Sequence, residues 1–373
     1  MDFEGQSRHL LIKPASSLCN MRCRYCFYAD VAAHREVPSF GLMSEETMKI
    51  LVEKSLGDAV SSCTFAFQGG EPTVRGLDFF KSFCRTVKEK NSRNIPVHYA
   101  MQTNGYVIDD EWAAFFKDEN FLLGVSLDGT VRTHNQNRLD SRHEGSFRRV
   151  WESIKILKKH EVDFNILTVV SKDTALAIDK IYRFYRARGL LYQQYIPCLD
   201  PLGEERGKYP YSLTPEVYGD FLITLFDLWA DDIRHGRFIY IRFFENLVGM
   251  LKGYPPESCG RAGFCQPQIV VEADGGVYPC DFYVLDEYKI GTIREDSFSD
   301  FERRRKESGF VDISLPAAPE CKDCPYFFLC RGGCRRDREP AQGDRMSLNY
   351  FCPAYKRFFE HALPVLQDIA RRV

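Results

Sequence analysis

The sequence has no excess of charge of either sign. Its 50 Lys and Arg face 52 Asp and Glu, for a formal net charge of −2 over 373 residues. Proteins that bind nucleic acid normally carry a basic excess, so this balance argues against nucleic acid as the main partner. The chain also lacks an apolar run long enough to span a bilayer. Its first residues, "MDFEGQSRHLLIKPASS", carry acids early and lack the long apolar core of a signal peptide. These absences predict a globular cytoplasmic protein that binds neither membranes nor nucleic acid.

Cysteine, in contrast, is abundant. The chain has 14 cysteines, and all but three lie within residues 19–26 and 259–352. Reducing compartments keep thiols from forming disulfides, so clustered cysteines in a cytoplasmic protein indicate metal or redox chemistry. The three outside these regions are expected to be small buried hydrophobes; they are Cys63, Cys84 and Cys198.

Up to residue 200 the sequence alternates short apolar runs with helical patterns. The apolar runs, most of which end in Gly, Asp or Pro as strands do before loops, are residues 9–15, 64–70, 98–105, 122–129, 163–170 and 191–200. The helical patterns are 44–57, 77–89, 109–118, 146–159 and 174–188. Strands separated by helices pair in parallel. The sequence therefore predicts an α/β fold with a partial (β/α)6 TIM-like barrel.

The alternation stops after residue 200. A long amphipathic helix is expected over 214–236, a hairpin in "IVVEADGGVYPCDF", and a last helix over 353–371. We expect residues 1–235 to form the barrel and residues 236–373 a cysteine-rich domain with the C-terminal helix.

The first cysteine loop is "CNMRCRYCFY", residues 19–28, in which Cys19, Cys23 and Cys26 follow a C-x3-C-x2-C spacing. Three thiols can hold three irons of a [4Fe–4S] cluster and leave the fourth iron open. An open metal position is a catalytic feature, because a closed shell cannot bind substrate. The alternative is a structural zinc site with a distant fourth ligand.

Three further motifs fall at the ends of the expected strands: "GGEP", "QTNG" and "SLDG". In β/α folds the chemistry lies at the carboxyl ends of the strands, so these motifs and the cysteine loop are expected to form one site.

The cysteine loop, placed after the first strand and followed by an aromatic residue, resembles that of the radical S-adenosylmethionine enzymes. This resemblance implies that S-adenosylmethionine binds the open iron and yields a 5'-deoxyadenosyl radical. "GGEP" resembles the motif that binds the methionine amino group, since glycines allow close approach and a carboxylate suits an ammonium. The cofactor contacts implied are Gln68, Gly69, Gly70, Glu71, Ser126 and Leu199. For Ser126 and Leu199 the alternative is an ordinary loop hydroxyl and a core leucine.

The C-terminal cysteines match the seven-cysteine SPASM pattern, with Cys259 as an eighth thiol. The resemblance implies two fully ligated auxiliary [4Fe–4S] clusters, and the alternative is a pair of zinc knuckles. One cluster would be held by Cys259, Cys265, Cys280 and Cys334, and the other by Cys321, Cys324, Cys330 and Cys352. A fully ligated cluster has no iron free for substrate, so an electron-transfer role is expected.

Asp281 directly follows Cys280. A carboxylate there could accept a substrate proton while the cluster accepts an electron; the alternative is an exposed Asp that caps a turn. Together with "FAFQGGEPT" and "CLDPLGEERGKYPYSL", the motifs resemble the anaerobic sulfatase-maturating enzymes, which convert a Cys or Ser of a sulfatase to Cα-formylglycine. The resemblance implies Asp281 as the general base and a substrate pocket that includes Tyr28 and Gln102. It also implies a sulfatase polypeptide as substrate and an electron donor such as flavodoxin or ferredoxin.

Two other functions stay open at this point. Related SPASM enzymes form thioether or carbon–carbon crosslinks in ribosomal peptides, and many carry an N-terminal leader-recognition domain. The first expected strand begins near residue 9, which leaves no room for such a domain and favours sulfatase maturation. A non-enzymatic iron–sulfur or zinc protein is the third hypothesis, and it predicts no cleavage of S-adenosylmethionine.

Overall fold

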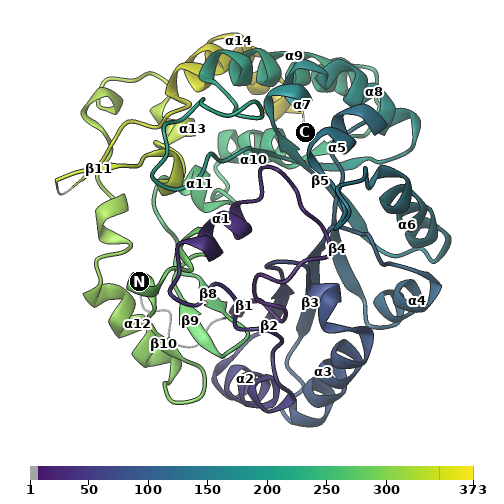
Figure 1. Cartoon of the computed structure of the whole chain (residues 1–373). Helices are drawn as coiled ribbons and strands as arrows, with labels where there is room; N and C mark the ends of the chain where they lie inside the picture. The colour runs from purple at the N-terminus through teal and green to yellow at the C-terminus, as the bar shows by residue number, and fades with distance from the viewer. Residues whose placement is uncertain (1–6, 344, 373) are drawn as a thin grey trace. The chain divides into compact units, whose positions relative to one another are not determined.

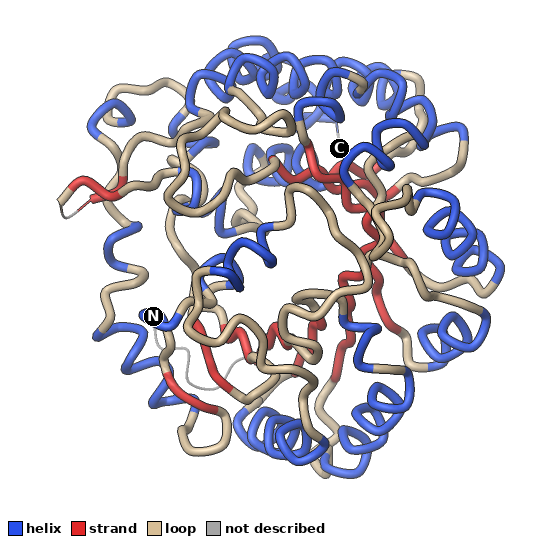
Figure 2. The backbone as a smooth tube through the Cα atoms, viewed as in Figure 1, coloured by secondary structure: helices blue, strands red, loops and turns tan. Residues whose placement is uncertain are grey.

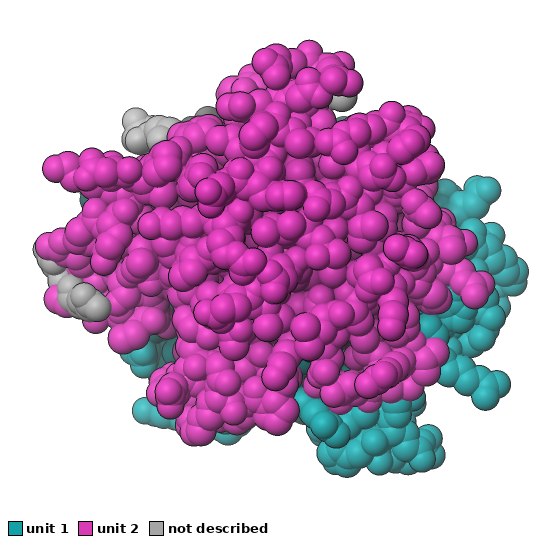
Figure 3. Space-filling model, turned by 90° about the horizontal axis from the view of Figure 1, so that it is seen from above, with its two compact units in different colours: residues 1–126, 138–164, 267–308 teal, residues 127–137, 165–266, 309–373 magenta. Residues whose placement is uncertain are grey.

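The computed structural model describes residues 7–343 and 345–372, which belong to two compact units (Figures 1 and 3). Unit 1 contains the chain up to residue 126, residues 138–164 and residues 267–308, and unit 2 contains the remaining stretches. Each unit is therefore assembled from segments that are far apart in the sequence.

Unit 1 is built on a mainly parallel sheet with the strand order β10-β9-β8-β1-β2-β3-β4. The bounds are β1 Arg8–Ile12, β2 Cys63–Phe67, β3 Val97–Thr103, β4 Phe121–Ser126, β8 Ile269–Val271, β9 Gly276–Tyr278 and β10 Gly291–Thr292. Strands β1 to β4 pair in parallel, and β8 adds to the free edge of β1, also in parallel. The last two pairings, β8 with β9 and β9 with β10, are antiparallel.

Most helices of unit 1 lie along the outer side of the sheet, and one short helix lies on its inner side (Figure 2). Their bounds are α1 Phe27–Ala33, α2 Glu45–Asp58, α3 Leu77–Lys90, α4 Asp110–Asp118, α6 Phe147–Lys159 and α12 Phe298–Glu307. Helices α2 and α3 lie outside strands β1 and β2, whereas α1 lies on their inner side (Figure 1). The apolar stripe of α3 packs Phe80 and Phe83 edge-on against Phe67 of β2, at centroid distances of 5.1 and 5.0 Å. Each such buried ring contributes roughly 1.5–3 kcal/mol to folding.

Unit 2 contains three parallel strands, most of the remaining helices and one short hairpin. The bounds are β5 Phe164–Val170, β6 Tyr192–Pro197, β7 Tyr240–Ile241, α5 Val131–Asn137, α7 Lys172–Leu176, α8 Ile178–Ala187, α9 Pro215–Arg234, α10 Arg242–Leu251, α11 Cys259–Ala262, α13 Phe327–Cys330, β11 Ala341–Gln342, β12 Arg345–Met346 and α14 Cys352–Arg372. Helices α9, α10 and α14 pack through Phe226, Phe244 and Phe358, whose rings lie 5.3 to 5.9 Å apart.

The α/β class, the parallel strands and their crossover helices are confirmed. The helix expected over 174–188 is wrong in one respect, because it breaks at Ala177 into α7 and α8. The Ser171 side chain caps the start of α7, whereas α8 starts at Ala177, which has no capping side chain. The sequence pattern therefore does not indicate the break. None of the described helices combines the length and apolar composition needed to cross a bilayer. The division at residue 235 stays a prediction.

Candidate active site

The three-cysteine loop follows β1 and leads into α1. The Cys26 amide donates to the Cys23 carbonyl at 3.3 Å, and the Cys19 sulfur accepts from the Met21 amide at 3.3 Å and the Asn104 side chain at 3.7 Å. Burial, followed by the nearby Glu71 and Cys26, raises the pKa of Cys19 to about 11. The three thiols therefore lie in one loop after β1, as the sequence predicted, and their role as cluster ligands stays a prediction.

The two glycines of "GGEP" are required by the chain itself. The Gly70 amide donates to the Ser16 carbonyl at 2.8 Å, and a Cβ at Gly70 would lie 2.2 Å from the Leu18 carbonyl oxygen. Gly69 has a φ of +122°, a conformation that favours glycine. These residues let the loop after β2 cross the segment that leads into Cys19.

Glu71 is buried, and its carboxylate is held by the protein. It accepts hydrogen bonds from the Thr73 amide (3.0 Å), the Thr73 hydroxyl (2.7 Å), the Thr103 hydroxyl (2.8 Å) and the Asn104 amide (2.7 Å). Burial raises the pKa of Glu71, and these four donors act in the opposite direction. Glu71 thus fastens the loop after β2 to the end of β3; its predicted contact with a cofactor stays a prediction.

Asp281 lies among polar side chains from three other elements of unit 1. Its Oδ2 accepts from the Tyr28 hydroxyl at 2.6 Å and from the Gln68 side-chain amide at 3.2 Å. Lys13 Nζ lies 3.0 Å from Oδ1 in an ion pair, although Oδ1 accepts no hydrogen bond. Asp281 is 9% exposed, which contradicts the alternative of an exposed turn-capping Asp.

Local packing explains why these groups meet. Asp281 begins a single 3-10 turn directly after Cys280, and this turn packs against α1 through an edge-to-face contact of Phe27 with Phe282 at 5.0 Å. Lys13 Nζ also lies 4.5 Å from the centre of the Tyr28 ring. Burial and the neighbouring Asp281 raise the pKa of Tyr28 well above its ordinary value, so Tyr28 remains a proton donor to the carboxylate.

Sequence reasoning missed Lys13 and a second buried ion pair, Arg35 with Glu272. Arg35 Nη1 lies 3.6 Å from Glu272 Oε1, and both side chains are almost fully buried. Burial raises the pKa of Glu272, and Lys13 and Arg35 counteract this. The available signal was a charged residue inside an apolar run, in "HLLIKPA" and "IVVEAD".

Two of the other predicted site residues, Gln102 and Ser126, contact each other, whereas Leu199 does not belong to the same unit. The Gln102 amide donates to the Ser126 hydroxyl at 3.2 Å. Gly124, opposite Gln102 in the β3–β4 register, makes room for it, since a Cβ there would lie 2.0 Å from Gln102 Oε1. Leu199 belongs to unit 2, where it follows β6 and is half-buried.

Unit 2 gathers the four cysteines predicted for one auxiliary cluster. Burial raises the pKa of Cys352 to about 11, Lys356 acts in the opposite direction, and the thiols of Cys330, Cys321 and Cys324 add to the rise. The Cys324 amide also donates to the Cys321 carbonyl at 3.3 Å. Four neighbouring sulfur donors fit an iron–sulfur cluster.

The second predicted set is divided between the units. Cys259, Cys265 and Cys334 lie in unit 2, and Cys280 lies in unit 1. Cys259 interacts electrostatically with Cys265, and the Cys334 Cβ lies 3.9 Å from the position that a Cβ would take at Gly260. Across the described ranges, no three His, Cys, Asp or Glu side chains converge as one metal ion would require.

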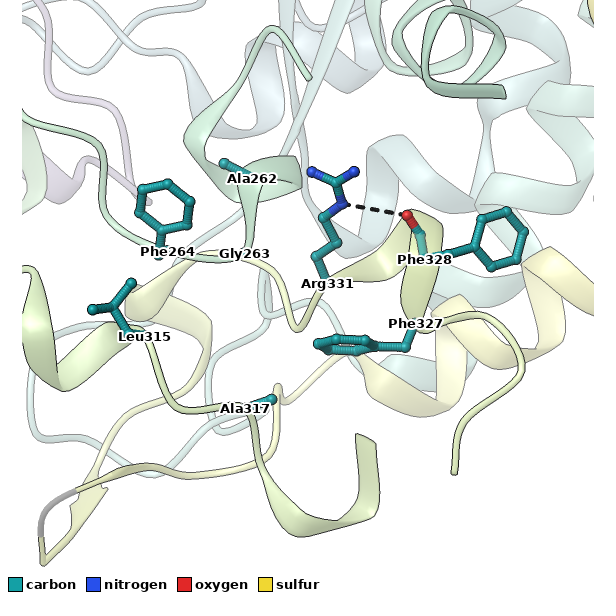
Figure 4. A pocket seen from close by; sticks show the side chains of 8 residues that line it. All are labelled: Ala262, Gly263, Phe264, Leu315, Ala317, Phe327, Phe328 and Arg331. Atoms are coloured by element: carbon teal, nitrogen blue, oxygen red, sulfur yellow. Dashed lines mark hydrogen bonds between the residues drawn. The ribbon is translucent and has the colours of Figure 1, made fainter. Parts of the chain in front are cut away.

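Unit 2 also has a cavity of about 280 Å³ that none of the predicted site residues lines (Figure 4). Its walls are mostly apolar, and Arg331 Nε donates to the Phe328 carbonyl at 3.3 Å. The lining residues are Ala262, Gly263, Phe264, Leu315, Ala317, Phe327, Phe328 and Arg331.

Comparison with known proteins agrees with this organisation. A model of the radical SAM superfamily matches residues 14–185, and a model of the iron–sulfur cluster-binding SPASM domain matches residues 259–325. The chain is 49% identical over 366 residues to a cysteine-type anaerobic sulfatase-maturating enzyme of Clostridium novyi, covering 98% of each chain. It is 31% identical to a serine-type enzyme of Bacteroides thetaiotaomicron, covering 98% of this chain and 92% of the relative.

Solved structures give the same result. The structure described as native anSMEcpe with bound AdoMet and Kp18Cys peptide superposes with a TM-score of 0.94 at 42% identity, covering 98% of this chain and all of that one. Streptococcus suis SuiB bound to its precursor peptide SuiA has a TM-score of 0.65 at 15% identity, covering 93% and 76%. At that identity the second match indicates the fold alone.

Proposed function

Because the chain belongs to the anaerobic sulfatase-maturating enzymes, radical SAM proteins with a SPASM domain, we propose that its target residue in a sulfatase polypeptide is a cysteine. The family reaction oxidises this residue to Cα-formylglycine. Identity supports the choice of cysteine: the cysteine-type relatives are 43% to 49% identical to this chain, and the serine-type relatives 26% to 31%.

The cofactors of this family are [4Fe–4S] clusters and S-adenosylmethionine. In our proposal Cys19, Cys23 and Cys26 hold the first cluster, and the eight C-terminal cysteines hold two others in the sets given above. When bound, these groups supply a hydrogen-abstracting radical and a sink for one electron. The mutual interactions of the thiols of Cys321, Cys324, Cys330 and Cys352 support this assignment.

The observation that carries the proposed mechanism is the position of Asp281. Oxidation of a cysteine to a thioaldehyde removes one hydrogen atom from Cβ, one proton from sulfur and one electron. Asp281 takes the thiol proton on its carboxylate. Tyr28 and Gln68 orient the carboxylate through Oδ2, and Lys13 balances its charge. Water then converts the thioaldehyde to the aldehyde and releases the sulfur as hydrogen sulfide.

We place the reaction in the cytoplasm, with a small flavin or iron–sulfur protein such as flavodoxin or ferredoxin as electron donor. The clustering of 11 of the 14 cysteines in two regions, which favours metal or redox chemistry over disulfides, supports a reducing compartment.

The test uses two peptides of a sulfatase motif that differ only in Cys or Ser at the target. After anaerobic reconstitution and incubation with S-adenosylmethionine and dithionite, mass spectrometry should find the aldehyde mainly in the Cys peptide. Equal or faster conversion of the Ser peptide would contradict the cysteine target. A Cys peptide that has lost two hydrogens but kept its sulfur after hydrolysis would indicate a crosslink instead of formylglycine, whereas in the Ser peptide the loss of two hydrogens is the aldehyde itself.

A further inference from the structure

Arg261 is a buried cation with an unsatisfied donor. It lies on α11, two residues after Cys259, and is 5% exposed. Its Nη1 is buried and has no hydrogen-bond partner among the residues that the structure describes. Buried charges are normally paired and hydrogen-bonded, because leaving them alone is costly. Nη1 therefore lacks an acceptor among the described residues, although the guanidinium interacts with the Tyr355 hydroxyl and with Asp337.

The surroundings of Arg261 hold it in place without neutralising it. The guanidinium packs on the rings of Tyr355 and Phe243, with its carbon 4.6 and 5.3 Å from their centres. Its electrostatic neighbours are the Tyr355 and Tyr218 hydroxyls and the Cys330 thiol. Its Nη2 lies 3.8 Å from the position that a Cβ would take at Gly333. Arg261 thus faces the turn that joins Cys330 to Cys334.

The nearest carboxylate does not balance this charge. Asp337 interacts with Arg261, but it is already paired with Arg206 at 3.3 Å and also interacts with Arg336. Arg338 adds another buried cation, which donates to the Ser314 carbonyl at 2.9 Å and interacts with the Cys321 thiol. Lys356 interacts with Cys352 and Glu320 with Cys321, so three cations and one carboxylate interact with these cysteines and positive charge is in excess.

A four-iron cluster held by four thiolates is a net anion and offers sulfur acceptors. We propose that Arg261 is the buried counter-charge of the cluster held by Cys321, Cys324, Cys330 and Cys352, and that it raises the reduction potential of this cluster. The inference rests on the ligand assignment under the proposed function. A nearby cation stabilises the reduced state, which carries one more negative charge, and charge and hydrogen bonds to sulfur tune such potentials. Arg261 would thereby favour acceptance of the substrate electron.

The test measures cluster potentials without any peptide substrate. Full-length Cys19→Ala/Cys23→Ala/Cys26→Ala protein is reconstituted anaerobically, so that only the auxiliary clusters remain, and is titrated with EPR detection. Arg261→Gln and Arg261→Met should shift the reduction equilibrium of one cluster about tenfold toward the oxidised state, ~59 mV for one electron. Arg261→Lys keeps the charge and should shift it less than about threefold.

Arg305 provides the matched control. It is also buried, with an unpartnered Nη1, and its charged neighbours are Glu302 and Arg8. Arg305→Gln should leave both potentials unchanged.

The outcomes separate charge from packing. Unchanged potentials in Arg261→Gln and Arg261→Met overturn the proposal, and so does loss of a cluster in all three Arg261 variants. Loss of four irons in the uncharged variants with retention in Arg261→Lys supports it. If the parent with intact Arg261 binds zinc in place of these irons, the ligand assignment itself fails.

Discussion

At the scale of single residues, the carboxylate of Asp281 is held by three side chains that are distant in sequence. Tyr28 and Gln68 donate to one oxygen, and Lys13 lies beside the other. Such contacts orient a carboxylate for proton transfer. The role of Asp281 as base and the importance of Lys13 can be tested separately.

Changing Asp281 to Asn keeps the shape and removes the basic oxygen. Loss of a general base typically costs about 10²–10⁴-fold in rate. We expect peptide oxidation to fall by this factor while cleavage of S-adenosylmethionine continues, with both products quantified by mass spectrometry. Asp286→Asn, an exposed acid five residues later, serves as control. Peptide oxidation at the parental rate in Asp281→Asn would rule out this role.

Lys13 and Asp281 form a buried ion pair, so removing one partner should destabilise the fold. Breaking such a pair costs about 3–5 kcal/mol, because the other charge is left uncompensated. We expect Lys13→Met to lower the free energy of unfolding by this amount in a denaturant titration. The Lys13→Met/Asp281→Asn double variant should lose less than the sum of the single changes. Additive losses would mean that the two groups do not interact.

The pKa values of Cys19 and Cys352 give a pH prediction for the cluster-free protein. Burial raises both to about 11, so the folded state favours the protonated thiols. Only thiolates are alkylated, so at pH 8 these two should react about 10²-fold more slowly than an ordinary thiol. The rates should rise with pH toward about 11, whereas denatured protein should react at ordinary rates. Fast alkylation of Cys19 or Cys352 in the folded protein at pH 8, identified by peptide mass spectrometry, would contradict the burial of these two thiols.

At the scale of elements, local patterns were more informative than distant pairings. The start of α2 at Ser44 was predictable, because its hydroxyl accepts the Thr47 amide at an N-terminal cap. The hairpin of β8 and β9 was equally clear from "ADGG". The seven residues of α1 are too few to show a helical period. The addition of β8 to β1 joins segments about 260 residues apart, and no local pattern encodes it.

The same distinction applies to the site. Cysteine spacing identified the thiols, because ligands within one loop are close in sequence. Lys13 and Asp281 meet only through the tertiary fold, so their contact was out of reach. The hydrogen bonds to the Glu71 carboxylate could not be predicted either, since its four donors come from the turn after β2 and from the end of β3.

The "GGEP" turn crosses the segment that leads into Cys19, and adding one methyl group at Gly70 tests whether this close approach is needed. Gly70→Ala would place a Cβ 2.2 Å from the Leu18 carbonyl, a backbone atom that must then move. We expect loss of the first cluster, seen as about four fewer irons per chain, and loss of 5'-deoxyadenosine formation. Gly57→Ala near the end of α2, where no atom lies within 4 Å, should retain both. Parental iron content and activity in Gly70→Ala would show that the crossing is not needed.

At the scale of the whole molecule, three groups of thiols predict the metal content. Eleven cysteines allow three cubanes, so anaerobically reconstituted protein should hold about 12 irons per chain. Replacing Cys19, Cys23 and Cys26 by Ala should leave about eight, and replacing Cys321, Cys324, Cys330 and Cys352 should do the same. Stoichiometric zinc with about four irons would show that the C-terminal cysteines bind zinc.

The pairing of β1 with β8 also determines when the sheet of unit 1 can form during synthesis of the chain. β1 is made about 260 residues before β8, so its second edge stays open until residues 269–271 have been made. An unpaired edge is prone to join other chains. Lys13, which follows β1, likewise meets Asp281 only after the long stretch between them has been made. The nascent chain can thus gather the thiols of Cys19, Cys23 and Cys26 long before Asp281 is made, so the side chains around Asp281 come together only after the intervening residues have been synthesised.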